Sequence, residues 1–398
     1  MNTVYIVDIL RTPVGKFGGA LSTVRPDDLA ALTIKKLIER NPAIDVNEIE
    51  DVLLGAANQA GEDNRNVARM ALLLAGLPLT IGGVTVNRLC ASGLQSIMDA
   101  SRGIMCGDGN IYIAGGVESM TRAPFVMAKN EHPFGRLADM HDTTIGWRFT
   151  NNKMVHLGHT NTMGETAENI AKKWNISRSE QDEFAAHSQE KYVAAEAKNR
   201  FHEERIKVEI PSKKEIITFE KDEQPRASGV EALSKLKPAF VADGTVTAGN
   251  SSGINDGAAC LILCNEATVK KYNLQPIAKI KSMAIAGVEP KYMGIGPVVA
   301  TRKALHRAGL QVSDLDLIEL NEAFASQSIA CIRDLALDTS KVNVNGGSIA
   351  IGHPLGASGS RISATLLHEM KKRNSRYGLA TMCIGVGQGA AIIYEGIQ

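Results

Sequence analysis

CASG, at residues 90–93, returns as GASG at residues 356–359. A longer pair of segments, IDVNEIEDVLLG at 44–55 and LQVSDLDLIELN at 310–321, is separated by the same 266 residues that separate 90 from 356. Acidic and apolar positions largely coincide in this pair. One short match would mean nothing, but matches in the same order at one offset indicate an internal repeat. The chain is therefore predicted to contain two copies of one structural unit.

Two further matches indicate what each copy contains. VTVN at 84–87 resembles VNVN at 342–345, and AGGV at 114–117 resembles CIGV at 383–386. In each copy a short β-rich run leads through the ASG turn into a segment of helical periodicity, which a second strand-like run follows. Alternating strands and helices predict an α/β fold with mainly parallel sheets that are covered by helices.

The two copies divide the chain into an N-terminal half, residues 1–272, and a C-terminal half, residues 273–398. Residues from about 120 to 248 have no counterpart in the second copy and are rich in charge. This segment includes an amphipathic helix candidate at 177–200 that begins with a capping box, a serine followed three residues later by a glutamate. We interpret the segment as an inserted lid or ligand-binding lobe.

The composition excludes several classes of protein. Lys and Arg number 44 and Asp and Glu 43 in 398 residues, so the basic excess of a nucleic-acid-binding protein is missing. The sequence has neither an apolar stretch of membrane-spanning length nor a signal-peptide pattern. Its six cysteines lack the spacing of zinc or thioredoxin-like motifs. We expect a cytoplasmic protein without nucleic-acid or membrane partners and without a metal site.

Two side chains near the repeated turn are candidates for chemistry. Cys90 follows a β-rich run and precedes a predicted helix, so its thiol would lie at a helix N-terminus, where amide dipoles favour the thiolate. The alternative is a buried structural cysteine. His353 lies in GGSIAIGHPLGASG, the loop that the second copy has lengthened. Because glycines and a proline surround it, rather than an apolar helix face, we interpret this histidine as an acid or base.

Two further candidates lie in or after strand-like runs. Cys383 lies in TMCIGVGQGAAIIYEG. The segment after GVGQG is strand-like, whereas a dinucleotide-binding fingerprint needs a helix there, so that interpretation is rejected. Glycines between two strands instead allow backbone N–H groups to point at an oxyanion. Asn321 and Glu322 follow a run whose end is where ligands bind in parallel sheets. Taken alone, Asn321 is only a candidate helix cap.

NRLCASGLQS, NEAFA, GGSIAIGHPLGASGSR and CIGVGQG together resemble the thiolase family. The resemblance covers nearly the whole chain, and four motifs in the family's order make it specific. It implies two similar halves stacked as five layers, αβαβα, with a CoA-binding loop domain inserted in the first half. It implies an acyltransferase that cleaves 3-oxoacyl-CoA with CoA, or runs the reverse Claisen condensation. CoA would be a co-substrate, with no cofactor permanently bound, and the chain would form a homodimer or homotetramer.

The resemblance also implies roles for individual residues. Cys90 would be the nucleophile that becomes acylated, and His353 would deprotonate it and help to hold an oxyanion. Cys383 would be the second acid and base, which moves the proton at the α-carbon of the acetyl unit. Asn321 would position a water in the first oxyanion hole. The backbone N–H groups of Cys90 and Gly385 would form the second.

The resemblance assigns CoA binding to the inserted lobe. Phe240, Ala248 and Ser252 match pantetheine-contacting positions of the family, Met163 lies in a further CoA-contacting motif, and Arg226 would lie near the adenine end.

Two features of the sequence bear on which acyl chain the enzyme would accept: a motif of acetoacetyl-specific thiolases is changed, and two other segments are similar to a different group of thiolases. Acetoacetyl-specific thiolases carry His-Met-Gly in the lobe, whereas this chain has Thr-Met-Gly at 162–164. The segments at 57–70 and 141–151 are instead similar to thiolases that cleave 3-oxoadipyl-CoA in aromatic-compound breakdown. That substrate ends in a carboxylate, for which Arg148 is a hypothetical partner because a guanidinium binds a carboxylate as a fork. The alternative is a surface or interface arginine.

Three competing interpretations remain open on the sequence. The expected substrate is 3-oxoadipyl-CoA or a general 3-oxoacyl-CoA of fatty acid metabolism, and the first alternative is a thiolase specific for acetoacetyl-CoA, an acetyl-CoA acetyltransferase. The second is a decarboxylating condensing enzyme of the same fold, which would lack the second catalytic cysteine; Cys383 argues against it. The third is a non-catalytic acyl-CoA carrier, which would lack one of the catalytic residues that this chain retains.

Overall fold

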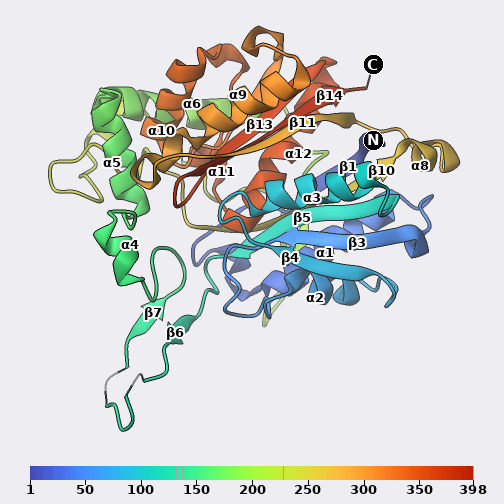
Figure 1. Cartoon of the computed structure of the whole chain (residues 1–398), viewed down its shortest axis with the longest axis horizontal. Coiled ribbons are helices and arrows are strands. Elements are labelled where there is room, and N and C mark those ends of the chain that lie inside the picture. The colour runs from blue at the N-terminus through green and yellow to red at the C-terminus, as the bar shows by residue number, and fades with distance from the viewer. Residues whose placement is uncertain (131, 137, 227, 398) are drawn as a thin grey trace.

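Two sets of strands, one from each copy of the repeat, form the body of the molecule (Figure 1). The computed structural model describes residues 1–130, 132–136, 138–226 and 228–397. The first set has the order β1 (Val4–Arg11), β10 (Asn255–Asn265), β5 (Ile111–Ser119), β3 (Ile49–Gly55) and β4 (Gly82–Val86), and β2 (Gly15–Lys16) pairs with β10. The second has the order β11 (Ala278–Gly287), β14 (Gln388–Gly396), β13 (Tyr377–Ile384) and β12 (Leu317–Leu320). A short pairing of β1 with β11 connects the two sets.

The strand directions correct the expectation of mainly parallel sheets. Within the described residues, only the pairs β3–β4, β3–β5 and β12–β13 are parallel, and the other pairs are antiparallel. The reason is that β10 and β14 enter the sheets without a crossover helix. β14 returns from β13 through the tight turn at 385–387, and β10 enters between β1 and β5 after the long inserted segment.

Helices cover both faces of each strand set. Those of the two halves are α1 (Pro26–Arg40), α2 (Val67–Leu74), α3 (Ser92–Cys106), α8 (Glu266–Lys271), α9 (Gly296–Ala308), α10 (Ala325–Leu335), α11 (Ser348–Ile351) and α12 (Leu355–Arg373). One apolar cluster joins α1 and α2 to the first strand set, a second holds α3 and α12 between the two sets, and a third joins α9 and α10 to the second set. The predicted five-layer arrangement αβαβα is therefore present.

The alternation of side chains along β5 shows how one strand serves two layers. Ile111 and Ile113 pack in the outer cluster with α1, whereas Tyr112 and Ala114 pack in the middle cluster with α3. Successive strand residues point to opposite faces, so a strand that is apolar throughout is covered by helices on both sides.

The repeated ASG turn brings the two central helices into very close contact. A Cβ on Gly93 of α3 would lie 2.7 Å from the carbonyl oxygen of Gly356 and 2.8 Å from the hydroxyl of Ser360. A Cβ on Gly359 of α12 would collide with the backbone nitrogen of Leu94. Leu94 and Ser360 are equivalent positions in the repeat, so the crossing is reciprocal. It places the segment around Cys90 against the segment that follows His353.

Replacing Gly359 by alanine is expected to lower the free energy of unfolding by about 1–3 kcal/mol or more, because the backbone of the facing helix cannot yield. Urea denaturation of both proteins would measure it. Gly287→Ala is a matched control, since its Cβ would lie 3.9 Å from the nearest atom, and it should change stability by less than about 0.5 kcal/mol. Equal stability of the two variants would contradict the close crossing.

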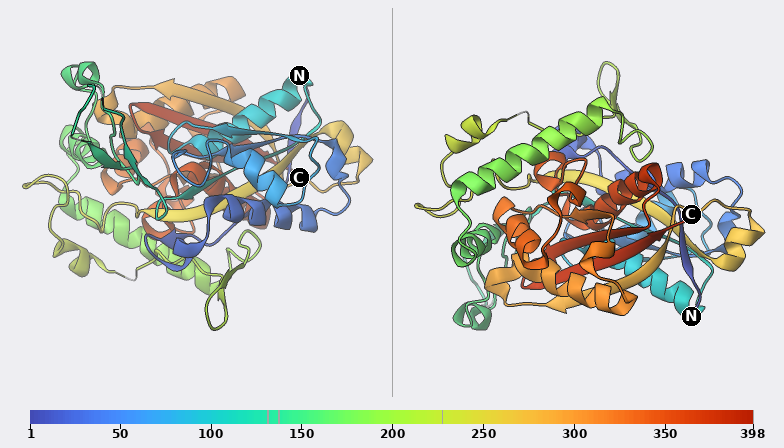
Figure 2. Two further views of the ribbon diagram at one scale, coloured as in Figure 1. Left: turned by 90° about the horizontal axis from the view of Figure 1, so that it is seen from below. Right: turned by 90° about the horizontal axis from the view of Figure 1, so that it is seen from above.

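The inserted segment forms a lobe that starts at one end of the molecule and runs along one side of its body (Figures 1 and 2). It contains β6 (Phe125–Met127), β7 (Met140–Asp142), α4 (Asn152–His156), α5 (Met163–Lys173), α6 (Arg178–Ala197), β8 (Val208–Pro211), β9 (Ile216–Phe219) and α7 (Val230–Ser234). The predicted capping box is present at the start of α6, between Ser177 and Glu180. α6 packs on the C-terminal half, where Ala185 and Ala186 contact Ala325. No helix in the described part of the chain is long and apolar enough to cross a membrane.

Candidate active site

Cys90 lies in the short connection between β4 and α3, at the wall of a cavity of about 310 Å³. The connection is tightly turned, with a φ of +48° at Leu89. The hydroxyl of Ser92 accepts the N–H of Arg88 at 2.9 Å and donates to the carbonyl of Leu89 at 2.6 Å. This turn leaves Cys90 partly accessible from the cavity, whose other lining residues include Glu118, Arg148, Met163, Leu355, Gly385 and Val386.

The protonation of Cys90 differs from the sequence expectation. Burial raises the pKa of its thiol to about 11, although hydrogen bonds from the N–H groups of Gly385 and of Cys90 itself act in the opposite direction. The nearby carboxyl group of Glu118 adds to the rise. Because α3 begins only at Ser92, its dipole does not outweigh this desolvation. At neutral pH the side chain of Cys90 is therefore a thiol, not a thiolate.

Alkylation of Cys90 should report this pKa directly. Because only the thiolate reacts, the rate constant with iodoacetamide is expected to rise about tenfold per pH unit from pH 7 to 10. Subtracting the rate of Cys90→Ala removes the contribution of other thiols, such as the exposed Cys106. A rate that levels off near pH 8 would show that the thiolate is already formed at neutral pH.

Cys383 lies on β13 close to Cys90 and, unlike Cys90, is fully buried. Burial raises the pKa of its thiol well above the ordinary thiol range, and the nearby Cys90 raises it further. Cys383 packs in one apolar cluster with Met163 and Phe324. The structure thus brings Cys90, Cys383, Met163 and Gly385 together, although they lie far apart in the sequence.

His353 and Asn321 form a second group, in direct contact through Asn321 Nδ2 and His353 Nε2 at 3.4 Å. The tautomer of His353 follows from its other nitrogen, Nδ1, which lies 2.6 Å from the hydroxyl of Ser358. That hydroxyl donates its one hydrogen to the carbonyl of Pro354 at 2.7 Å, so it must accept from Nδ1–H. Nε2 consequently carries the free lone pair, as a base requires.

Asn321 is held in one orientation from its far side. Its Oδ1 accepts the hydroxyl of Ser348 at 2.6 Å, and the oxygen of Ser348 accepts a guanidinium N–H of Arg361 at 2.6 Å. This leaves the amide nitrogen of Asn321 directed at His353. Burial lowers the pKa of His353 to about 3, and the positive charge of Arg361 contributes. The imidazole is therefore neutral across the physiological pH range.

Two local features connect the two groups. The N–H of Asn321 donates to the carbonyl of Thr381, two residues before Cys383, at 3.0 Å. Leu355, two residues after His353, lines the same cavity as Cys90.

Asn321 is not the N-cap of the helix that follows it, because the N-cap of α10 is Phe324. Glu322 is buried and accepts from Ser188, Asn343 and Ile349, so it fixes this turn.

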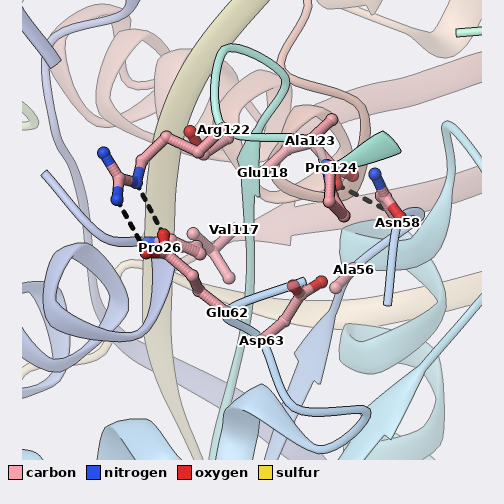
Figure 3. Close-up of a pocket in the computed structure, with 11 residues that line it drawn as sticks. Pro26, Ala56, Asn58, Glu62, Asp63, Val117, Glu118, Arg122, Ala123 and Pro124 are labelled. Carbon is pink, nitrogen blue, oxygen red and sulfur yellow. Dashed lines mark hydrogen bonds and ion pairs between the residues drawn. The ribbon is translucent and has the colours of Figure 1, made fainter. Parts of the chain in front are cut away.

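Glu118 is the buried carboxyl group of the cavity wall. It accepts the backbone N–H groups of Ala57, Asn58 and Gly356 at 2.9, 3.1 and 2.8 Å. Burial nevertheless raises its pKa to about 7. Glu118 also lines a second, very small cavity. In that cavity two guanidinium nitrogens of Arg122 donate to the two carboxylate oxygens of Glu62 (Figure 3). Glu118 thus ties the segment at 57–58 to the start of α12 beside Cys90.

The residues expected to hold CoA lie in several places. Phe240 packs on Gly164, next to Met163, and its ring lies 6.1 Å from that of Phe324. The N–H of Ser252 donates to the carbonyl of Ala323 at 3.0 Å. These contacts bring the lobe up to the turn that carries Asn321.

Two other expected CoA-binding residues lie apart from this group. Ala248 is exposed. Arg226 is also exposed, and its backbone N–H is bound by Gln189 of α6. Among the described contacts, none joins either residue to the Cys90 cavity.

Several residues that shape the site were missed by sequence reasoning. Ser358 belongs to the ASG turn, whose sequence indicated only the repeat. Asn255, on β10, accepts the N–H of His353 at 2.8 Å. Glu118 follows the repeated AGGV segment directly, a position that could have signalled it. Ser348 lies in the glycine-rich loop, where nothing distinguishes it from a spacer.

A partly accessible thiol, a second thiol, a neutral imidazole and converging N–H groups are the groups that an enzyme transferring acyl groups through cysteine requires. The chain belongs to the thiolase family: the thiolase N-terminal domain matches residues 4–267 and the thiolase C-terminal domain matches residues 274–396. It is a thiolase and an acyltransferase, as the sequence resemblance implied.

Individual relatives agree with this assignment. The chain is 54% identical to the 3-oxoadipyl-CoA/3-oxo-5,6-dehydrosuberyl-CoA thiolase of Escherichia coli K12, over 99% of this chain and 100% of that protein. It is 55% identical to the beta-ketoadipyl-CoA thiolase of Pseudomonas putida, over 99% and 100%. The crystal structure of Bacillus anthracis acetyl-CoA acetyltransferase matches with a TM-score of 0.93 at 40% identity, covering 100% of this chain and 99% of that one. The thiolase fold is thereby confirmed.

Proposed function

We propose that this thiolase cleaves 3-oxoadipyl-CoA with CoA, giving acetyl-CoA and a four-carbon acyl-CoA that keeps the terminal carboxylate. The observation that carries the mechanism is the hydrogen bonding of Cys90 by two N–H groups, its own and that of Gly385. The relatives that are named for this substrate support the choice.

In the first half-reaction, Sγ of Cys90 attacks the C3 carbonyl as its proton passes to Nε2 of His353. The C2–C3 bond then breaks, the acyl group stays on Cys90, and the electron pair passes to an enolate of acetyl-CoA. Asn321 and His353 stabilise the enolate oxygen, and Cys383 delivers its thiol proton to C2. Preorganised donors at such an oxygen contribute about 3–4 kcal/mol each. The neutral tautomer of His353 supports this assignment, because its Nε2 can accept a proton.

In the second half-reaction, the Cys383 thiolate takes the proton of the CoA thiol, and the CoA sulfur attacks the acyl-Cys90 carbonyl. The N–H groups of Cys90 and Gly385 stabilise the oxygen of the tetrahedral intermediate. Collapse of that intermediate breaks the bond to Cys90, which recovers its proton from His353. CoA is therefore a co-substrate that is consumed in each cycle.

Thiolysis of three substrates side by side tests the substrate: acetoacetyl-CoA, a medium-chain 3-oxoacyl-CoA and 3-oxoadipyl-CoA. We expect the highest kcat/KM with 3-oxoadipyl-CoA. A clear preference for acetoacetyl-CoA would instead support the acetyl-CoA acetyltransferase alternative. Thr162 argues against that alternative, because its hydroxyl lies 2.9 Å from Glu165 in the capping box of α5, where acetoacetyl-specific thiolases carry a histidine.

We further propose that the enzyme is a cytoplasmic homodimer or homotetramer. The β6–β7 hairpin extends away from the body of the molecule (Figure 1) and exposes Phe125, Met127, Phe134 and Met140. Exposed apolar side chains grouped in this way are typical of a surface that another subunit covers. Light scattering of the purified protein measures the number of subunits.

A further inference from the structure

Arg148 is the only cation among the described residues that line the Cys90 cavity. It is half-buried, and no carboxylate in the described parts of the chain forms an ion pair with it. Arg122, which lies near Glu118, differs in having a carboxylate partner, because its guanidinium donates to both oxygens of Glu62 at 2.6 Å (Figure 3). Arg122 is thus already paired with a carboxylate, whereas the guanidinium group of Arg148 is available to bind one.

The segment that carries Arg148 is fixed on both sides. Thr143 donates its hydroxyl to the carbonyl of Pro124 at 2.6 Å and accepts the side-chain amide of Asn58 at 2.9 Å. The indole N–H of Trp147 donates to the carbonyl of Asn161 at 3.3 Å. Residues 143–148 all line the cavity. Arg148 therefore belongs to a wall that is built before substrate arrives, which reduces the entropy lost on binding.

Among the charged side chains of the cavity wall, Arg148 is the one suited to bind an anion. The other acidic or basic side chain of this wall, apart from the thiol of Cys90, is Glu118, and three backbone N–H groups already occupy its oxygens. CoA itself brings phosphates, but these lie at the far end of the pantetheine arm from the thioester. An anion that reaches this wall beside Cys90 must be part of the acyl chain.

We propose that Arg148 binds the terminal carboxylate of the acyl chain and so selects 3-oxoacyl-CoA substrates that end in a carboxylate. This inference rests on the proposed function, because it requires such a substrate. A guanidinium is suited to the task, since its two N–H groups match the two carboxylate oxygens. The cavity then distinguishes acyl chains by their end group in addition to their length.

The experiment compares two substrates of equal chain length, 3-oxoadipyl-CoA and 3-oxohexanoyl-CoA, in the wild type and in Arg148→Gln. A lost charge-assisted contact should lower kcat/KM for 3-oxoadipyl-CoA about 10- to 100-fold. The value for 3-oxohexanoyl-CoA should change less than about threefold, since its end group is a methyl. Arg148→Lys, which keeps the charge but loses the fork, should fall between wild type and Arg148→Gln for the charged substrate.

Arg65→Gln is the matched control. Arg65 is exposed and does not line the cavity, although it lies in the segment that begins with Ala57 and Asn58 of the wall. The Arg65→Gln substitution removes the same charge and should leave kcat/KM for both substrates unchanged. Equal losses for both substrates in Arg148→Gln would overturn the role of Arg148 while leaving the proposed substrate intact. A wild type that cleaves 3-oxohexanoyl-CoA as well as 3-oxoadipyl-CoA would instead overturn the proposed substrate.

Discussion

Replacing Cys90 by alanine is expected to lower kcat/KM for thiolysis by about 10⁴-fold or more, because no other group can carry the acyl chain between the half-reactions. The variant should keep its stability, since Cys90 is partly accessible and fills no closed part of the core. Steady-state thiolysis and mass spectrometry of the acyl-enzyme measure the two consequences: the wild type gains the mass of an acyl group and the variant does not.

Cys106→Ala provides the control for this experiment. Cys106 is the last residue of α3, the helix that follows Cys90, and is exposed. Its removal should leave kcat/KM and acyl-enzyme formation unchanged. Activity within about tenfold of wild type in Cys90→Ala would rule out the covalent mechanism.

Replacing Cys383 by alanine should have the second largest effect, a loss of about 10³-fold in thiolysis, the range expected for one acid–base group. The two half-reactions should separate. Acylation of Cys90 by acetyl-CoA should still occur, whereas exchange of the α-protons of acetyl-CoA with deuterated water should stop. Mass spectrometry follows the first process and NMR the second.

Cys331→Ala is the matched control for Cys383, because its thiol is also buried and donates to the carbonyl of Gly294 rather than to the cavity. Proton exchange at a normal rate in Cys383→Ala would assign the α-carbon chemistry to another group. The same experiment distinguishes a thiolase from a decarboxylating condensing enzyme, which does not depend on a second thiol.

The fold was predictable because each pattern behind it is a short local stretch of sequence. The repeated ASG turn marks the crossing of α3 and α12, and apolar runs such as β5 are continuous because helices cover both faces. The direction of β10 was not predictable, because it depends on where the chain returns after the inserted lobe. A strand has the same apolar pattern in either direction, so antiparallel pairing left no signal.

The candidate site was predictable as a set of residues but not as a set of charges. Cys90, Cys383 and Gly385 come together as expected, and so do His353 and Asn321. The sequence favoured a thiolate at Cys90, because a helix follows it, but desolvation dominates and raises the pKa of that thiol to about 11. Burial depends on residues from all parts of the chain, so local sequence cannot predict it.

The reciprocal glycine contact between α3 and α12 has a consequence for how substrate reaches the thiols. In many enzymes with two domains, the domains separate to admit substrate. Here the two halves are in close contact where Gly93 of α3 meets Gly356 of α12. A movement that separated the halves would carry Cys90 away from the segment that follows His353. Acyl-CoA is therefore expected to reach the cavity without separation of the two halves, and each half expressed alone is expected to be inactive.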